Sequence, residues 1–204
     1  MAAEMAIMAD FAAIGAVSSS LKAVLEQAIT FSLEPQLAGT PIDLRSPKEL
    51  RIAGLSPVVS LWLYRVTRND DLINLPALRV PPRRILPRPF PVNLHYLITP
   101  MTAQPIDSHR LLGRVLQIMH DNALLAGALL DPTLVAGGVD QLRVHFEPHS
   151  LEELTRIWYS LHEHYDLSCS YIVQFLPIAS QREPVDAPPV MVAKADYAEI
   201  LEER

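Results

Sequence analysis

Hydrophobic positions recur at helical spacing in three stretches of the chain. Apolar residues early in the sequence repeat about every 3.6 positions, which predicts a first helix over residues 5–31. Residues 107–121 carry a single apolar stripe and are predicted to form an amphipathic helix whose start is capped by Asp107 or Ser108. A capping-box pattern followed by apolar residues at helical spacing predicts a third helix over residues 150–162.

Four further stretches have the pattern of β-strands. Residues 57–67 are apolar on both alternating faces and rich in β-branched and aromatic side chains, which predicts an interior strand. Residues 92–99 and 142–147 alternate apolar with polar positions, as half-buried strands do, and Phe146 belongs to the inward set. Residues 167–178 are predicted to form the last strand.

The order of these elements predicts an α+β fold. A helix is followed by two strands, then by helix, strand, helix and strand. Short strands and long amphipathic helices in this order are typical of a small mixed or antiparallel sheet of about four strands, with helices packed on one face. We expect one such domain over residues 1–180.

Composition narrows the class of protein. The chain has 204 residues, of which 50% are hydrophobic, so it can bury a sizeable core. A net charge of −6 argues against general nucleic-acid binding, which requires a surplus of lysine and arginine. Cys169 is the only cysteine, so no intramolecular disulfide is possible. No apolar run is long enough for a membrane span, and Glu4 and Asp10 argue against a signal peptide. We therefore expect a protein that folds in the cytoplasm.

No motif in the chain predicts catalysis or a cofactor. Phosphate-binding glycine loops, the dinucleotide fingerprint and the G-x-S-x-G elbow do not occur. His109 and His120 lie about 16 Å apart along their helix, too far for one metal ion to join them. His145 and His149, together with Glu147, are the best metal candidates, and a small metal-dependent enzyme built on them is the alternative. We therefore expect no catalytic residue, no bound metal ion and no cofactor.

Two charged segments fall outside the predicted core. The first is a proline- and arginine-rich loop at residues 76–91, and no acidic residue occurs from Leu72 through Ile106. Its arginines are Arg79, Arg83, Arg84 and Arg88. The second is an extended arm at residues 181–204 with an acidic end. The acidic residues at that end are Asp196, Glu199, Glu202 and Glu203. Such segments are either solvated or in contact with neighbours of opposite charge.

Several consecutive segments carry a resemblance to a known family. They are the L-Y-R-V-T strand, the L-H-Y-L-I-T-P strand, the R-L-L-G helix, and the S-L-E-E-L helix followed by the Y-x-L-S-x-S-Y strand. In this order they resemble the cap proteins, or tail terminators, of contractile injection systems, which are phage-tail-like particles with an inner tube and a contractile sheath. The resemblance covers most of residues 1–180 and excludes the proline–arginine loop and the last twenty residues.

The resemblance implies a tail-terminator-like fold and a structural function without catalysis. Cap proteins of this family form a six-subunit ring that ends the inner tube and the sheath and joins them. The implied partners are further copies of the chain, the sheath protein and the inner tube protein, with no nucleic acid and no direct membrane insertion. The arginine loop would then contact acidic surface on the sheath or last tube ring, and the acidic arm an adjacent subunit or the sheath end. A neck or baseplate-adaptor role in the same particle is the alternative.

Overall fold

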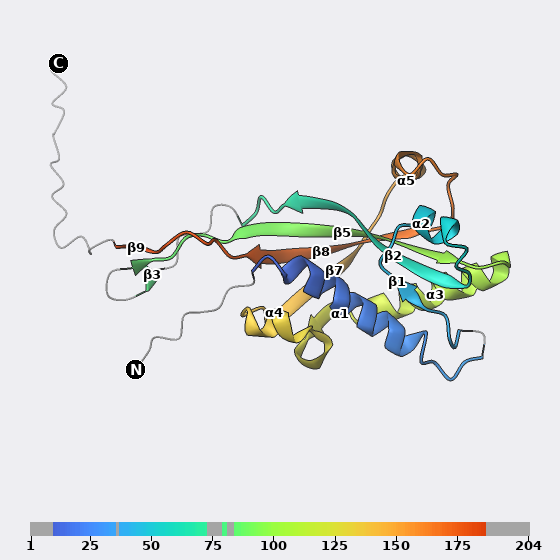
Figure 1. Ribbon diagram of the computed structural model, residues 1–204, viewed down its shortest axis with the longest axis horizontal. Coiled ribbons are helices and arrows are strands. Elements are labelled where there is room, and N and C mark those ends of the chain that lie inside the picture. Colours follow the sequence, from blue (N-terminus) through green and yellow to red (C-terminus); the bar gives the residue numbers. More distant parts are fainter. Residues whose placement is uncertain (1–9, 36, 73–78, 81–83, 187–204) are drawn as a thin grey trace, which may run out of the picture.

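The long strands of the chain pair into one six-stranded mixed sheet (Figure 1). The computed structural model describes residues 10–35, 37–72, 79–80 and 84–186. In spatial order the strands are β1 (Ile42–Asp43), β2 (Val58–Arg68), β5 (Phe90–Met101), β8 (Cys169–Ile178), β7 (Gln141–Glu147) and β6 (Leu124–Ala126). Only the β1–β2 pair is parallel within this sheet.

The four strands predicted from the sequence are the four adjacent central strands of this sheet. The longest pairing joins β2 to β5, from Val58 opposite Met101 to Arg68 opposite Val92, and it has an irregularity between Leu63 and Arg65. The edge strands β1 and β6 contain only two and three residues, too few for a periodic pattern. The predicted α+β class is therefore confirmed, with two short strands added at the edges.

Helices α1 (Ala13–Ala28), α3 (Pro105–Asp121) and α4 (Pro132–Ala136) cover one face of the sheet (Figure 1). The main core lies between these helices and the strands. Its fully buried side chains include Leu21 and Leu25 of α1 and Leu94 and Ile98 of β5. Tyr96 also points into this core, where its hydroxyl lies 2.8 Å from Ser18 Oγ and so keeps a hydrogen bond. The short helix η1 (Gly127–Leu129) follows β6.

Helices α2 (Pro47–Ile52) and α5 (Leu151–Ser160) lie on the opposite face, although the sequence predicts helices on one face only (Figure 1). A capping box opens each of them, formed by Ser46 with Glu49 and by Ser150 with Glu153. Trp158 of α5 is fully buried against Leu97, which points away from the main core. The second face is covered because residues 57–67 and their neighbours are apolar on both sides at this end of the sheet.

Two local expectations were wrong. Helix α3 begins at Pro105, with Gln104 as an N-cap that makes no side-chain hydrogen bond, so neither Asp107 nor Ser108 caps it. Proline is favoured at the first helical position because its backbone angle is already helical. Phe146 is 53% exposed because it lies near the end of β7, where its ring contacts only the edge of Tyr171 among the described aromatic rings.

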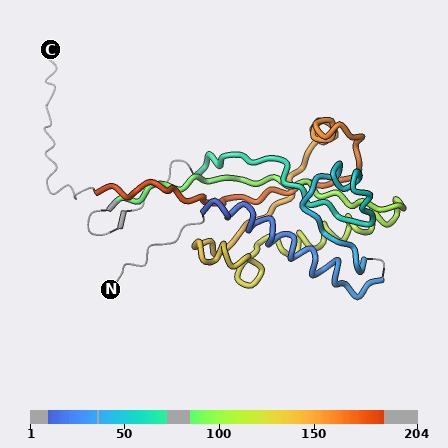
Figure 2. Tube along the Cα trace, in the orientation of Figure 1, coloured from blue at the N-terminus to red at the C-terminus, as the bar shows by residue number. Residues whose placement is uncertain are grey.

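A narrow projection extends from one end of the sheet, away from the helices (Figure 2). We call it the projecting arm, or simply the arm, and keep the name acidic arm for residues 181–204. Strands β5 and β8 run into it, and a separate three-stranded sheet follows. Its strands are β3 (Arg79–Val80), β4 (Arg84–Ile85) and β9 (Val185–Asp186). The proline–arginine loop and the start of the acidic arm therefore pair with each other through β4 and β9. Among the described residues, no helix is both long enough and apolar enough to cross a membrane.

Candidate functional site

The predicted interface arginines lie along the projecting arm. Arg79 belongs to β3 and Arg84 to β4, while Arg88 is exposed between β4 and β5. Arg83 falls outside the described residues, and so do the acidic residues of the second predicted segment. Those residues are Asp196, Glu199, Glu202 and Glu203. The structure thus gathers Arg79, Arg84 and Arg88 on one projection and leaves the acidic end of the chain undescribed.

The arm has little core of its own. Each strand of its sheet contains two residues, and β4 pairs on both sides, with Arg84 opposite the oppositely charged Asp186. Large apolar side chains on the arm are open to solvent: Phe90 is 54% and Val185 is 63% exposed. A short ribbon without a packed face gains little stability alone. Exposed apolar and basic groups on such a ribbon are suited to contact with another protein.

A polar cluster connects the sheet with the start of α5. Glu147 lies at its centre, where His95 Nδ1 is 2.9 Å from both carboxylate oxygens and His149 Nε2 is 3.4 Å from Oε2. Tyr64 Oη donates to Glu147 Oε2 at 3.3 Å and lies 2.9 Å from His149 Nε2, and Ser170 Oγ donates at 3.1 Å. Five residues from β2, β5, β7, β8 and the loop before α5 thus form one hydrogen-bonded cluster.

Several opposing effects act on the Glu147 carboxyl. Partial burial is the largest and raises its pKa, but the hydrogen bond from His95 and the electrostatic effects of His95 and His149 lower it. Together with the hydrogen bond from Ser170 they hold the pKa below its ordinary value. The cluster therefore keeps Glu147 as a carboxylate that ties the surrounding elements together.

The cluster is not the metal site considered from the sequence. His145 is exposed and pairs in register with Ile172, whereas His95 and His149 both contact Glu147. Within the described parts of the chain, no three histidine, cysteine, aspartate or glutamate side chains are placed to hold a metal ion. His95 lies on the polar face of β5 as a hydrogen-bonded structural residue, with contacts to Thr67 and Glu147.

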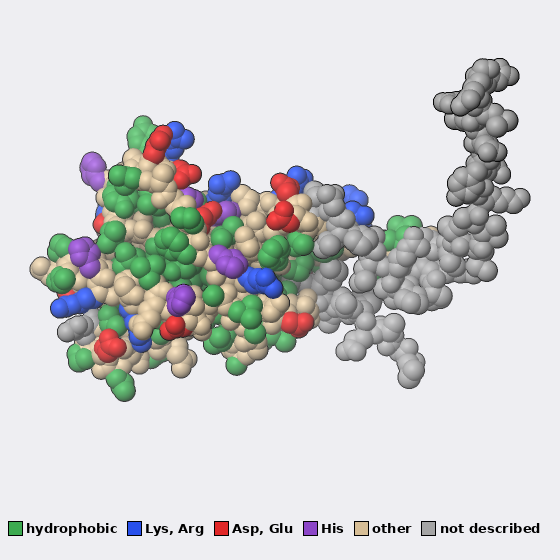
Figure 3. Space-filling view, turned by 180° about the vertical axis from the view of Figure 1, so that it is seen from behind, with side chains coloured by type: hydrophobic (Ala, Val, Ile, Leu, Met, Phe, Trp, Pro, Cys, Tyr) green, Lys and Arg blue, Asp and Glu red, His purple; other side chains and the backbone are tan. Residues whose placement is uncertain are grey.

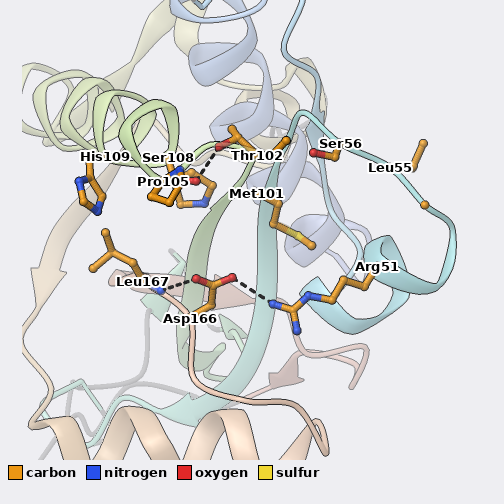
Figure 4. A pocket seen from close by; sticks show the side chains of 13 residues that line it. Arg51, Leu55, Ser56, Met101, Thr102, Pro105, Ser108, His109, Asp166 and Leu167 are labelled. Atoms are coloured by element: carbon orange, nitrogen blue, oxygen red, sulfur yellow. Dashed lines mark hydrogen bonds and ion pairs between the residues drawn. The ribbon is translucent and has the colours of Figure 1, made fainter.

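A cleft of about 420 Å³ opens among α2, the end of β5, the start of α3 and the loop before β8 (Figure 4). Arg51 forms its rim by pairing with Glu163 and with Asp166, the latter at 3.0 Å. The apolar part of the cleft wall is formed by Leu55, Met101 and Leu167. The described contacts supply no activated nucleophile here, because Ser108 Oγ bonds to Thr102 Oγ1 at 2.8 Å rather than to a base. The cleft therefore combines apolar wall with an ion-paired rim.

Large apolar side chains are also exposed on the body of the molecule, where hydrophobic groups lie between charged ones (Figure 3). Leu151 and Tyr159 of α5 are 66% and 77% exposed, and Ile52 of α2 is 77% exposed. Apolar groups are therefore open to solvent on both helices of the second face.

Solved structures that are similar to this fold include a terminator and a cap. One is the sheath/tube terminator of an extracellular contractile injection system, PVC, in its extended state, with a TM-score of 0.60 and 22% identity. The other is the tube-terminating cap of the anti-feeding prophage, with a TM-score of 0.55 and 19% identity. The matches cover 92% and 89% of this chain, but 64% and 60% of those proteins, so the chain spans less than two thirds of either.

Comparison by sequence gives one family and no curated relative. No curated protein matches the chain. The family model described as the Pvc16 N-terminal domain matches residues 16–191, which takes in the whole six-stranded sheet, α1 from its fourth residue on, the other helices on both faces and the last strand of the arm. The chain therefore belongs to the Pvc16 N-terminal domain family.

Proposed function

We propose that the chain is the terminator cap of a contractile injection system. Six copies form a ring on the end of the inner tube and sheath, stop their polymerisation and join the two cylinders. The observation that carries this proposal is the fold, which is similar over 92% of the chain to the PVC sheath/tube terminator. The chain folds in the cytoplasm and joins a particle that is released or is held at a membrane by other proteins.

The chemistry of the described surface supports a structural role. Its polar cluster holds secondary-structure elements together, and its cleft has apolar walls and an ion-paired rim. A ring requires a head-to-tail contact between two different surfaces of the same chain, with a rotation that returns on itself. An elongated subunit with an arm at one end and exposed apolar groups on its body provides separate surfaces for such contacts.

The two charged segments supply contacts in this proposal. Arg79, Arg83, Arg84 and Arg88 engage acidic surface on the sheath or the last tube ring, since the arm projects clear of the body. The acidic residues after Pro188 dock on an adjacent subunit or on the sheath end. Complementary charge of this kind directs association and selects the partner.

The test of the function uses purified tube–sheath particles that lack their cap. The full-length chain is added, the particles are imaged by negative stain, and the mass of the free chain is measured by light scattering. We expect density for a ring at one end only of each particle. A chain that stays monomeric and does not bind particles would contradict the proposal, and binding at the opposite end would favour a baseplate-adaptor role.

Charge reversal tests the contribution of the arm. Replacing Arg83, Arg84 and Arg88 by glutamate should reduce the capped fraction of particles about tenfold or more, because attraction to an acidic surface becomes repulsion. The circular dichroism spectrum should be unchanged, since the arm lies outside the main core. Arg156→Glu on exposed α5 is the matched control and should leave capping intact. Undiminished capping by the triple variant would exclude the arm as the contact.

A further inference from the structure

Basic side chains lie on the part of the sheet that α5 leaves open. Register aligns Arg65, His95, Ile172 and His145 in one row across β2, β5, β8 and β7. Arg143 precedes His145 by two residues on β7, so its side chain lies on the same face. His95 is buried in the row, whereas Arg65, Arg143 and His145 are exposed. We call Arg65, Arg143, His145 and the half-buried Ile172 the basic platform.

Among the described residues, no acidic residue lies directly across from a basic residue of the platform on the next strand. Arg65 faces His95, Arg143 faces Gln174 and Leu124, and His145 faces Ile172. An opposite charge directly across on the next strand would stabilise such a residue. Neither Arg65 nor Arg143 forms an ion pair within the described parts of the chain. Five other arginines do: Arg45, Arg51, Arg68, Arg110 and Arg156.

We infer that the basic platform of one copy binds the acidic segment 187–204 of an adjacent copy in the ring. The segment has four acidic residues against Lys194 and Arg204. It also carries Tyr197, Ile200 and Leu201, which can contact Ile172. It follows β9 at the end of the arm, and its eighteen residues can span roughly 60 Å when extended. The inference rests on the proposed ring, since it assigns one of the contacts between subunits.

The strength of this contact depends on several ion pairs acting together. A single exposed ion pair contributes little, and salt screens it. Two arginines opposite four carboxylates form a set whose binding should weaken as ionic strength rises. Reversal of charge on either side should abolish binding, and reversal on both sides should restore it.

The test is disulfide trapping between two full-length variants. One carries Gln141→Cys, an exposed position two residues from Arg143 on the platform face, and the other carries Ala198→Cys within the acidic segment. Neither substitution removes a charge. Thr155→Cys, exposed on α5, replaces Gln141→Cys in the control pair. The native Cys169 is buried and does not compete.

After mild oxidation of the mixture, we expect about fivefold more crosslinked dimer than from the control pair, the effect of a few weak ion pairs. Adding Arg65→Glu and Arg143→Glu to the platform variant should reduce the yield to the control level. Adding Glu199→Lys and Glu202→Lys to the other variant should then restore it.

Three results would overturn the inference. The first is a yield of crosslinked dimer equal to that of the control pair, and the second is a yield that charge reversal does not change. The third is that a chain carrying both Gln141→Cys and Ala198→Cys forms only a disulfide within one chain. Failure of the proposed function can be distinguished from failure of this inference, because the function is tested by the capping of particles and the inference by the crosslink. Capped particles without the crosslink reject only this contact. A specific crosslink without capped particles supports the contact and rejects the terminator role.

Discussion

Glu147 connects three neighbouring strands with the start of α5. Its carboxylate receives hydrogen bonds from Tyr64, His95 and Ser170. Glu147→Gln removes the charge that these donors share, so we expect a loss of about 1 to 2 kcal/mol in the free energy of unfolding at pH 7. Urea denaturation followed by circular dichroism measures this loss.

The same residue predicts an acid dependence of stability. The pKa of Glu147 is lower in the folded protein than its ordinary value of 4.5. Its contribution is therefore fully present above about pH 4.5 and is lost as the pH falls through the lower, folded-state pKa. The difference in unfolding free energy between the wild type and Glu147→Gln should shrink below pH 4. Glu152→Gln, which removes only an exposed ion pair with Arg156 on α5, should change the unfolding free energy at pH 7 by less than about 0.5 kcal/mol. A constant difference across this range would contradict the assignment.

Cys169 illustrates how burial controls reactivity at a single residue. Its side chain lies in the main core and is 6% exposed, and burial raises the pKa of the thiol to about 12. Only the thiolate reacts with alkylating reagents. We expect no labelling by iodoacetamide at pH 8 in the folded protein and complete labelling in urea, as measured by mass spectrometry. Rapid labelling without denaturant would show that β8 opens readily.

At the scale of elements, α5 is held to the sheet mainly by Trp158. This side chain is fully buried, packs with Leu97 and donates from Nε1 to Ser168 Oγ at 3.2 Å. Trp158→Ala should cost about 3 to 5 kcal/mol of unfolding free energy, because it leaves a cavity under the helix. Hydrogen exchange should accelerate most in α5 and less in the strands of the main core.

The neighbouring aromatic residue provides the control for α5. Tyr159 is 77% exposed, and Tyr159→Ala should change the unfolding free energy by less than about 0.5 kcal/mol. Equal costs for the two substitutions would mean that the helix is not held through its buried face. Uniform acceleration of exchange throughout the sheet would mean that α5 and the main core unfold as one unit.

At the scale of the whole molecule, the arm is an addition to a core that is complete without it. Of the side chains that the structure describes in β4 and β9, none belongs to the main core. Asn69 and Pro91 are joined by a backbone hydrogen bond, so the chain returns to the body at that point. Replacing residues 71–89 with an Asn-Gly turn should therefore lower Tm by less than about 4 °C.

Capping should respond differently to this replacement. The shortened protein should be unable to cap particles, because it lacks the loop that is proposed to contact the sheath or the tube. Differential scanning calorimetry and negative-stain imaging of the same sample separate the two effects. A large loss of Tm would mean that the arm stabilises the body, and normal capping would place the contact elsewhere.

Local pattern predicts much of this fold. Alternation or continuous apolar runs identify β2, β5, β7 and β8, and helical spacing identifies α1, α3 and α5, because each of these elements is long enough to show its period. The pairing of β4 with β9 could not be predicted, since each has two residues and they are about one hundred positions apart. The contact of His95 with Glu147 depends on the register of separate strands, which the sequence does not state.

The sequence by itself determined the class of the fold, the identity of its long elements, the absence of known catalytic motifs and the resemblance to tail terminators. These properties follow from local spacing and from the order of segments. Tertiary structure alone decided that α5 covers the second face, that Arg79, Arg84 and Arg88 share one projecting arm, and that Arg65 and Arg143 lie on one face of the sheet without ion pairs among the described residues. The physical reason is that strand register and packing join residues far apart in the chain, and only their joint geometry determines which charges remain unbalanced.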